Sequence, residues 1–311
     1  MVAARLNDRR RWGIIYCPRI GAVNKIKKWR EIRSYLVEKG VTYDYIQSED
    51  YGSVERLACM LADNGYETIV VVGGDGALQD AVNGVMSSER RANVSLGIIP
   101  NGIANDFAAY WGLSENDYKR AADCIIAGRT RKIDVGCCSY VVDDSEKKRY
   151  FLNAVNIGLS ANIVELANKK VRAPWAKYLS YIRSFMLLLL HRNSYDVKMR
   201  INNQVVEERL MLLCVGNARG YGMTPSAVPY NGYLDVSAIM KPKFFGLLQG
   251  IYMMYKRRIM NYKLMKPFRT MDMVIESVGN AAAGIDGRPF SPTYPLRINI
   301  EKEVLNLIIP K

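Results

Sequence analysis

The chain has 311 residues, 49% of them apolar and 24% charged, a composition that excludes a disordered tail and a fibrous protein. At about 150 residues per domain, this length favours two domains. Lys and Arg outnumber Asp and Glu by 44 to 30, and the net charge of +14 indicates an anionic partner such as a nucleic acid, a phosphate-rich ligand or an anionic membrane surface.

The excess positive charge lies almost entirely in the second part of the chain. Residues 1–130 contain 17 basic and 16 acidic residues, whereas residues 131–311 contain 27 basic and 14 acidic residues. A surface charged only for solubility would not show this asymmetry. We therefore expect two regions with different partners.

Several features argue against whole classes of protein. No apolar stretch follows the basic residues of the N-terminus, so no secretory signal peptide is expected. No apolar run is longer than that of Phe185–Leu190, which is far shorter than the ~20 residues that span a bilayer. The single histidine, His191, argues against a histidine triad or a multi-histidine metal site. Without a CxxC pair, the cysteines are predicted to be reduced thiols of a cytoplasmic protein: Cys17, Cys59, Cys124, Cys137, Cys138 and Cys214.

Strand-like and helix-like segments alternate through the first part of the chain. Strands are predicted at 13–17, 43–47, 68–72 and 95–99, and helices at 25–39, 53–64, 77–86, 104–110 and 115–127. This alternation is typical of an α/β domain with a parallel sheet covered by helices on both faces. Ligands of such domains bind at the carboxyl ends of the strands, so the loops after Val72 and Ile99 are the first candidates for a site.

The pattern changes after about residue 133. Longer alternating segments predict strands at 149–156, 196–201, 208–215, 271–277 and 296–300, which indicates an antiparallel, β-rich second domain. Helices are predicted at 175–190 and 244–260. We place the first domain at 1–134 and the second at 135–300.

The first candidate loop lies in Thr68–Met86, where a buried strand with four apolar β-branched residues leads into GGDG and a helix. Because Gly73, Gly74 and Gly76 have no Cβ, the backbone can take a positive φ and approach a phosphate closely, next to the free N–H groups of the helix N-terminus. Asp75 is suited to holding a divalent cation or to organising the loop. The simpler alternative is a tight turn. GGDG followed by Asn83 and Gly84 favours a phosphate site.

The second candidate loop repeats this arrangement. In Ser95–Tyr110 an apolar strand leads into Pro100, Asn101 and Gly102, and Asn105 and Asp106 begin the next helix. Two such loops on neighbouring parallel strands predict a convergent site for one polyphosphate.

Several motifs in a fixed order resemble the diacylglycerol kinase catalytic-domain family, lipid kinases that include sphingosine and ceramide kinases. The bacterial soluble lipid kinases are the most similar in pattern, over essentially the whole chain. An NAD kinase would have Asn-Glu in place of Asn83–Gly84, which argues against that relative. The motifs are GGDG with Asn83–Gly84, LGIIPNG with Asn105-Asp106-Phe107, Ile133–Gly136, Asn156–Ala161, Val215–Ala227, Asn231–Val236 and Ile285–Gly287.

The resemblance implies a nucleotide-binding first domain, to which a strand at about 301–311 returns, and a β-sandwich-like second domain for the lipid acceptor. It implies transfer of the γ-phosphoryl group of Mg-ATP to the hydroxyl of a diacylglycerol or sphingoid lipid, with Asp286 as the base. The implied metal ligands are Asp75, Asn231, Leu234 and Asp235. The residues expected to bind the nucleotide are Gly73, Gly74, Asp75, Gly76, Ala77, Asn83, Gly84, Pro100, Asn101, Gly102, Asn105, Asp106 and Arg288.

Four positions depart from the family pattern. Ala77 and Ile103 stand where the family has threonines, so two phosphate-facing hydroxyls are lost. Arg288 replaces the Glu of Asp-Gly-Glu, and a guanidinium cannot replace a carboxylate as a Mg²⁺ ligand. Asn231 replaces the first Asp of a segment that binds a structural Mg²⁺ in bacterial members. Two readings follow: a working lipid kinase, or a nucleotide- and lipid-binding member that transfers phosphate poorly.

The segment Lys241–Arg269 contains eight basic residues and no acidic residue, interleaved with aromatics such as Phe245 and Tyr252. Basic residues beside exposed aromatics suit an anionic membrane surface, so we expect peripheral membrane association. The alternative is an ordinary amphipathic helix with its aromatics in the core. Nucleic-acid binding is not expected, because it has no recognised motif here and leaves the glycine loops unexplained. The oligomeric state is left open, a homodimer included.

Overall fold

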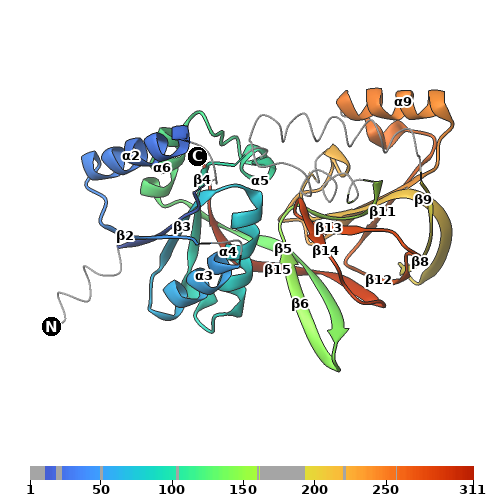
Figure 1. Cartoon of the computed structure of the whole chain (residues 1–311), viewed down its shortest axis with the longest axis horizontal. Coiled ribbons are helices and arrows are strands. Elements are labelled where there is room, and N and C mark those ends of the chain that lie inside the picture. The colour runs from blue at the N-terminus through green and yellow to red at the C-terminus, as the bar shows by residue number, and fades with distance from the viewer. Residues whose placement is uncertain are drawn as a thin grey trace. The chain divides into compact units, whose positions relative to one another are not determined.

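The structure, a computed structural model, describes residues 11–18, 23–49, 52–102, 105–159, 161, 193–219, 222–256 and 258–311. The chain separates into two compact units (Figure 1). Unit 1 comprises Met1–Ile133 and Glu303–Lys311, and unit 2 comprises Asp134–Lys302. The helix predicted at 175–190 lies outside the described residues.

The centre of unit 1 is a parallel sheet. Its strands are β1 (Trp12–Tyr16), β2 (Tyr43–Gln47), β3 (Thr68–Gly73) and β4 (Ser95–Pro100), arranged in the order β2-β1-β3-β4. Beyond β4, Asn306 and Leu307 of β15 (Leu296–Ile308) pair in parallel with Ser95 and Leu96. The side chains of β3 between Ile69 and Val72 are at most 1% exposed, as expected for a sheet covered on both faces.

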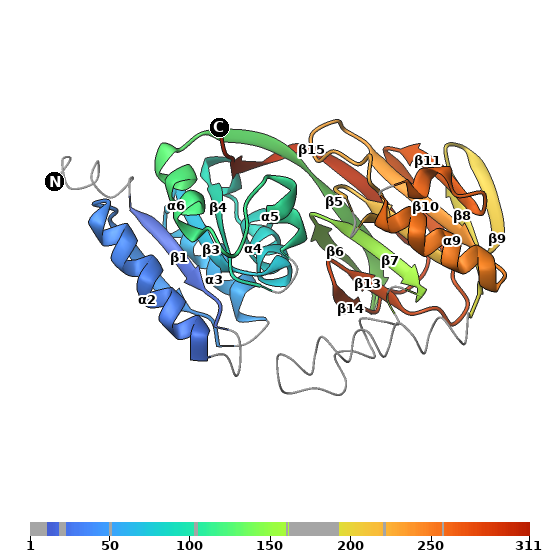
Figure 2. The ribbon, with the colours of Figure 1, turned by 90° about the horizontal axis from the view of Figure 1, so that it is seen from above.

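Two pairs of helices cover this sheet (Figures 1 and 2). The helix α2 (Val23–Glu38) packs with α6 (Tyr118–Ala127), and α3 (Ser53–Asp63) packs with α4 (Asp75–Ser87). A short helix, α5 (Asp106–Tyr110), follows the loop after β4. In α3 the buried residues recur at helical spacing, and they include Val54, Leu57, Ala58 and Leu61. The α/β architecture predicted for the first part of the chain is confirmed.

Unit 2 consists mainly of antiparallel strands, which confirms the predicted β-rich second domain. The long strand β9 pairs with three other strands. Its first half pairs with β8, and its second half pairs with both β7 and β10. The strands are β5 (Thr130–Val142), β6 (Ser145–Phe151), β7 (Ala154–Gly158), β8 (Tyr195–Ile201), β9 (Gln204–Gly216), β10 (Leu234–Met240), β11 (Met265–Thr270), β12 (Asp272–Ser277), β13 (Ala283–Ile285), β14 (Arg288–Phe290) and the first part of β15.

Three hairpins of unit 2 turn through two residues with positive φ. These residues are Asp143 and Asp144 between β5 and β6, Asn202 and Asn203 between β8 and β9, and Asp286 and Gly287 between β13 and β14. Two successive positive φ angles are the signature of a type I′ turn, which favours Asn, Asp and Gly. The Asp286-Gly287 dipeptide is therefore a hairpin turn as well as a sequence motif.

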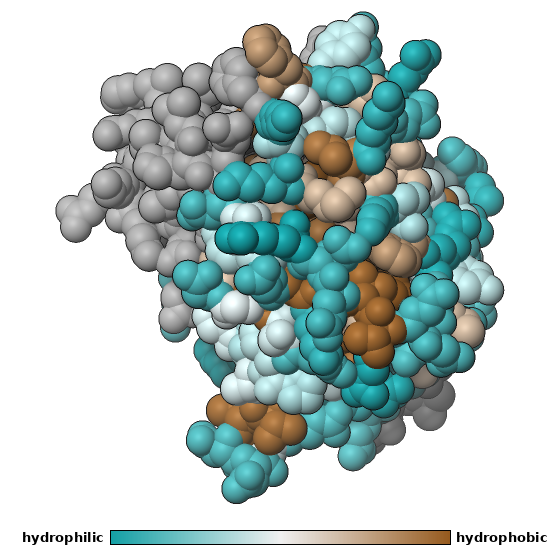
Figure 3. Space-filling view, turned by 90° about the vertical axis from the view of Figure 1, so that its right-hand side faces the viewer, coloured by the Kyte–Doolittle hydropathy of each residue, from teal (hydrophilic) through white to brown (hydrophobic). Residues whose placement is uncertain are grey.

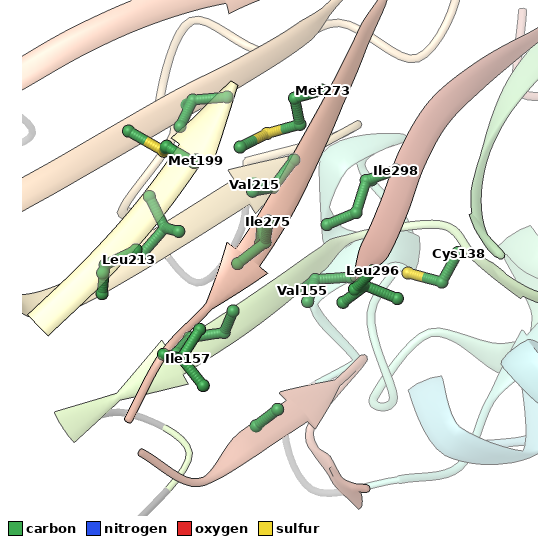
Figure 4. Close-up of a cluster of buried hydrophobic side chains, with 14 of the residues drawn as sticks. Cys138, Val155, Ile157, Met199, Leu213, Val215, Met273, Ile275, Leu296 and Ile298 are labelled. Atoms are coloured by element: carbon green, nitrogen blue, oxygen red, sulfur yellow. The ribbon is translucent and has the colours of Figure 1, made fainter. Parts of the chain in front are cut away.

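The core of unit 2 lies between these strands (Figure 4). Apolar side chains from β7, β8, β9, β12 and β15 point toward one another there, among them Val155, Met199, Val215, Ile275 and Ile298. Each of these five residues is buried.

A separate apolar cluster lies under helix α9 (Phe244–Tyr255), where Leu247 packs with Ile259 and Tyr262. The helix predicted at 244–260 ends earlier than expected, because the Arg258 N–H donates to the Met253 carbonyl in a bond that closes a helix end. Within the described parts of the chain, no helix combines the length and the apolarity needed to cross a membrane.

Candidate functional site

The first glycine loop joins β3 to α4. Gly73 ends the strand, Gly74 precedes the helix with a φ of −102°, and Asp75 begins it. The positive φ expected at these glycines and at Gly76 does not occur. Glycine is required for space instead, because a Cβ on Gly73 would lie 2.9 Å from the Cβ of Ala77.

The second loop lies directly against the first. Pro100 is the ladder partner of Gly73, and the Asn101 N–H donates to the Gly73 carbonyl over 2.7 Å. A Cβ on Gly102 would lie 2.5 Å from the Cα of Gly74, and a Cβ on Gly74 would lie 2.9 Å from the Cα of Gly102. Because this contact is between two backbones, a side chain at either glycine would force the loops apart.

One polar side chain ties the two loops together, and a second one stabilises the second loop internally. The Asp75 carboxylate accepts the main-chain N–H groups of Asp106, at 2.9 Å, and Phe107, at 3.1 Å. Asn105, with a φ of 51°, accepts the Gly102 N–H through Oδ1 over 2.8 Å. Of the two roles expected for Asp75, these bonds describe the organisation of the loops.

The predicted nucleotide residues of unit 1 divide into two groups. Asn83 lies eight residues after the start of α4, about 12 Å along the helix, and its Nδ2 donates to the Gln79 carbonyl. Gly84 faces α3, where a Cβ would lie 2.1 Å from the Glu55 carbonyl oxygen, so α3 packing requires this glycine. Ile103 lies outside the described residues. The structure gathers the others around the two loops: Gly73, Gly74, Asp75, Gly76, Ala77, Pro100, Asn101, Gly102, Asn105 and Asp106.

Asp286 of unit 2 is 2% exposed, and its carboxylate forms hydrogen bonds with the main chain just before and at the start of β7. Its oxygens accept the N–H groups of Leu152 at 2.8 Å, Asn153 at 2.9 Å and Ala154 at 2.9 Å. Three such donors stabilise the ionised carboxylate. Burial raises the pKa of Cys138 well above its ordinary value, and the charges of Cys137 and Asp286 act in the same direction. These contacts join the β13–β14 hairpin to the start of β7.

Arg288 is half-buried at the start of β14 and pairs across the hairpin with Ile285. The type I′ turn places it two residues after Asp286 on the other strand of the hairpin. A cation therefore stands beside the turn where the family pattern has a carboxylate.

The residues expected to hold a structural metal in unit 2 do not fit one. The Asp235 carboxylate accepts Arg269 Nε at 2.7 Å and Nη2 at 3.3 Å, and also the Ser226 hydroxyl at 2.8 Å. Asn231 Oδ1 accepts the Tyr233 N–H, and the apolar side chain of Leu234 is fully buried. Among the described residues, no cluster of three or more His, Cys, Asp or Glu side chains could hold a metal ion. An arginine thus supplies the positive charge at Asp235.

Three buried asparagines of unit 2 were not predicted as site residues. The Oδ1 atoms of Asn153, Asn156 and Asn217 have no hydrogen-bond partner in the described structure, although each residue is at most 6% exposed. A buried acceptor without a donor costs about 1–3 kcal/mol, so each is a candidate to accept a hydrogen bond from water or a ligand hydroxyl. Their sequence signal was the motifs that contain Asn156 and Asn217.

Comparisons with known proteins agree on the family. The model of the diacylglycerol kinase catalytic domain matches residues 11–138, and that of the YegS C-terminal NAD kinase beta sandwich-like domain matches residues 153–309. A Mycobacterium tuberculosis protein named diacylglycerol kinase is 26% identical over 282 residues, covering 89% of this chain and 87% of that protein. A protein of the same name from Staphylococcus carnosus is 25% identical over 237 residues, covering 75% of this chain and 74% of that protein.

A solved structure has the same fold. A Bacillus anthracis protein described as a candidate diacylglycerol kinase superposes with a TM-score of 0.78 at 21% identity, covering 97% of this chain and 96% of that chain. Together the two family models span nearly the whole chain in the order that its motifs predict. The chain belongs to the diacylglycerol kinase-like family, with a diacylglycerol kinase catalytic domain followed by a YegS-type β-sandwich-like domain.

Proposed function

We propose that this protein is an ATP-dependent lipid kinase that transfers the γ-phosphoryl group of ATP to the hydroxyl of a diacylglycerol or sphingoid lipid. The observation that carries the proposal is the backbone contact between Gly74 and Gly102, which brings two glycine loops together at the carboxyl ends of β3 and β4. Carboxyl ends of neighbouring parallel strands are where such folds bind nucleotides.

The chemistry of these loops suits a polyphosphate. The first N–H groups of α4 have no acceptor within the helix, and the helix dipole adds partial positive charge at the same end. Neither loop carries a basic side chain, so phosphate affinity depends on main-chain donors. Asp75 keeps both loops in register, which orients those donors before the nucleotide binds.

In this proposal Mg²⁺ accompanies the nucleotide and neutralises phosphate charge. Mg²⁺ bound in this way needs only one or two protein carboxylates, and Asp75 is the carboxylate that the first loop offers. The Asp235 region has no part in it, because Arg269 already neutralises that carboxylate.

A second candidate function is a nucleotide- and lipid-binding protein with weak transfer. The surroundings of Asp286 favour it: the carboxylate that would deprotonate the lipid hydroxyl is buried and accepts three main-chain N–H groups. Arg288 adds a cation two residues away, where the family has a second carboxylate. A carboxylate that already accepts these hydrogen bonds is less able to take the proton of the lipid hydroxyl.

The test is transfer of labelled phosphate from ATP to a panel of diacylglycerols, sphingoid bases and NAD, with ATP binding measured on the same preparations. Gly74→Ala is the inactive control, because its new Cβ would meet the Gly102 backbone. Gly97→Ala is the matched control, since the atoms nearest to a Cβ there belong to the side chain of Ile125, which can move.

We expect the unmodified protein and Gly97→Ala to phosphorylate at least one lipid, and Gly74→Ala to lose ATP binding and transfer. ATP binding without transfer to any lipid supports the second candidate function. Transfer to NAD alone, or retention of full ATP affinity by Gly74→Ala, contradicts the proposal.

A further inference from the structure

Helix α9 carries an exposed apolar stripe. Phe245 is 82% exposed, Leu248 is 49% exposed and Tyr252 is 61% exposed. At 100° per residue, these three positions fall within about 60° of the helix circumference. Large apolar side chains on one exposed face of a helix are what an interaction surface requires.

The opposite face of α9 fixes the helix in this orientation. Leu247 is 6% exposed and packs on the cluster that contains Ile259 and Tyr262. The Tyr262 hydroxyl donates to the Gly246 carbonyl over 2.8 Å, and the Tyr262 ring lies close to the position that a Cβ of Gly250 would take. Turning the stripe inward would break these contacts, so the exposure of Phe245 is built into the packing.

Lysines stand at both ends of the stripe. Lys241 and Lys243 precede the helix and are exposed, and exposed Lys256 follows it with its ammonium 5.9 Å from the centre of the Tyr252 ring. The whole segment 241–269 contains no acidic residue. The side of unit 2 that faces right in Figure 1 is otherwise mostly hydrophilic, with apolar atoms in separate patches (Figure 3).

We propose that the stripe of Phe245, Leu248 and Tyr252, with Lys241, Lys243 and Lys256, is the surface through which this protein docks on an anionic lipid bilayer. Aromatic and aliphatic side chains enter the headgroup region while lysines contact lipid phosphates, the combination that holds amphipathic helices at an interface. The need for such a surface rests on the proposed lipid kinase function, but its chemistry rests on α9 alone.

A nucleic acid would bind the lysines, but its binding does not explain why an exposed leucine lies beside them. A protein partner could cover the stripe, but a cation-rich segment without acidic residues of its own suits a uniformly anionic surface better than the mixed charges of a protein interface. The bilayer is therefore the occupant that accounts for both halves of the surface.

The experiment is co-sedimentation of the full chain with vesicles of phosphatidylcholine alone or of phosphatidylcholine with phosphatidylglycerol, without ATP. The apolar variant is Phe245→Ser/Leu248→Ser/Tyr252→Ser, and the charge variant is Lys241→Gln/Lys243→Gln/Lys256→Gln. The matched control is Val141→Thr/Val205→Thr, which alters exposed apolar residues elsewhere in unit 2. Unfolding midpoints check that each variant is folded.

We expect the unmodified protein and the matched control to bind the anionic vesicles. The charge variant should lose about tenfold or more in partition coefficient, with little change on neutral vesicles. The apolar variant should lose a similar factor on both. In Phe245→Trp, the fluorescence of the added tryptophan should shift to shorter wavelength when anionic vesicles are present.

Unchanged binding by the apolar variant, or an equal loss in the matched control, overturns the proposal. Binding to an oligonucleotide at matched salt, without vesicle binding, overturns it as well. Transfer to a water-soluble, short-chain lipid is measured in parallel. Phosphate transfer without vesicle binding rejects the docking surface and supports the proposed kinase function. Vesicle binding without phosphate transfer supports the docking surface and contradicts the kinase function.

Discussion

The Arg269 guanidinium donates from Nε to Oδ1 of Asp235 over 2.7 Å, and the two residues are direct partners across the β10–β11 ladder. The Asp235 side chain is only 9% exposed, whereas that of Arg269 is 51% exposed. Hydrogen bonding to Asp235 raises the pKa of Arg269, so the guanidinium keeps its positive charge beside the carboxylate. The positive charge beside Asp235 therefore comes from an arginine of unit 2, at a position where the motif resemblance implied a metal ion.

Arg269→Ala should lower the free energy of unfolding by about 1–3 kcal/mol, because it leaves a buried carboxylate without its cation. Urea unfolding measures this loss. The matched control is Arg297→Ala, which breaks an exposed pair with Asp272 at 3.8 Å and should cost no more than about 0.5 kcal/mol. Chelation of divalent cations should leave the unmodified protein's midpoint unchanged, and a clear drop on chelation would contradict the arginine assignment.

Asp286→Asn should destabilise unit 2 by about 2–4 kcal/mol. The amide keeps one oxygen for the main-chain donors but removes the charge and places an NH₂ group against N–H groups. Asn tolerates the φ of 45°, so backbone strain does not explain the loss. Thermal and urea unfolding provide the measurement. Asp143→Asn, in an exposed turn with a φ of 48°, is the matched control and should be nearly neutral.

The outcome for Asp286 bears directly on catalysis. A large loss of stability means that inactivity of an Asp286→Ala protein proves nothing about a catalytic base, so activity must be compared under conditions where both proteins are folded. Unchanged stability with lost transfer would instead support the role of Asp286 as a base.

Ala77→Thr should tighten ATP binding by about tenfold relative to Ala77→Val, since the two side chains have the same shape and only threonine offers a hydroxyl to a phosphate. Ala77 lies in the first turn of α4, behind Gly73. Isothermal titration calorimetry of both variants measures the difference. Equal affinities would show that the loop does not place this position against a phosphate.

The free energy of unfolding should fall between pH 9 and pH 11. Burial raises the pKa of Cys137 to about 11, whereas an unfolded thiol titrates near its ordinary pKa of 9.0. The native protein therefore holds this proton more tightly, and the part of the free energy of unfolding that is present below pH 9 is lost as the pH rises from 9 to 11. Burial also raises the pKa of Tyr294, to about 12, so the free energy of unfolding should continue to fall above pH 11.

Urea midpoints across this range measure the effect, and thiol labelling locates it. Native protein should react at the half-buried Cys59 and Cys124 before Cys137, Cys138 and Cys214, which are buried. Labelling of Cys137 in the native state at neutral pH would contradict the prediction.

The secondary structure of unit 1 could be predicted from the sequence because it depends on patterns of neighbouring residues. Runs of β-branched residues such as those of β3 form fully buried parallel strands, and α3 shows its apolar face at helical spacing. The strand at 43–47 was predicted with its observed bounds, and the other elements differ by a few residues at their ends. The glycine loops were found by the same local reasoning, although their glycines serve contact instead of positive φ.

What the sequence did not reveal depends on distant partners. The donors to Asp286 come from a segment up to 134 residues earlier, and the Asp235–Arg269 pair depends on the register of β10 with β11. Gly84 was taken as part of a phosphate motif, whereas its neighbour is the Glu55 backbone on another helix. No periodicity encodes such pairings. The Asp286-Gly287 turn, by contrast, could have been predicted from the dipeptide itself, but we interpreted these residues only as part of a motif.

The strand β15 has a consequence for how the chain is synthesised and folded. Its Asn306 side chain donates to the Ala92 carbonyl, 214 residues earlier, and its backbone pairs with β4. The nascent first unit thus leaves the ribosome with one edge of its sheet unpaired, and that edge is covered only after β15 has been synthesised. Folding of unit 1 cannot be completed before unit 2 has been synthesised, and a chain cut at residue 133 should expose a strand edge that promotes aggregation.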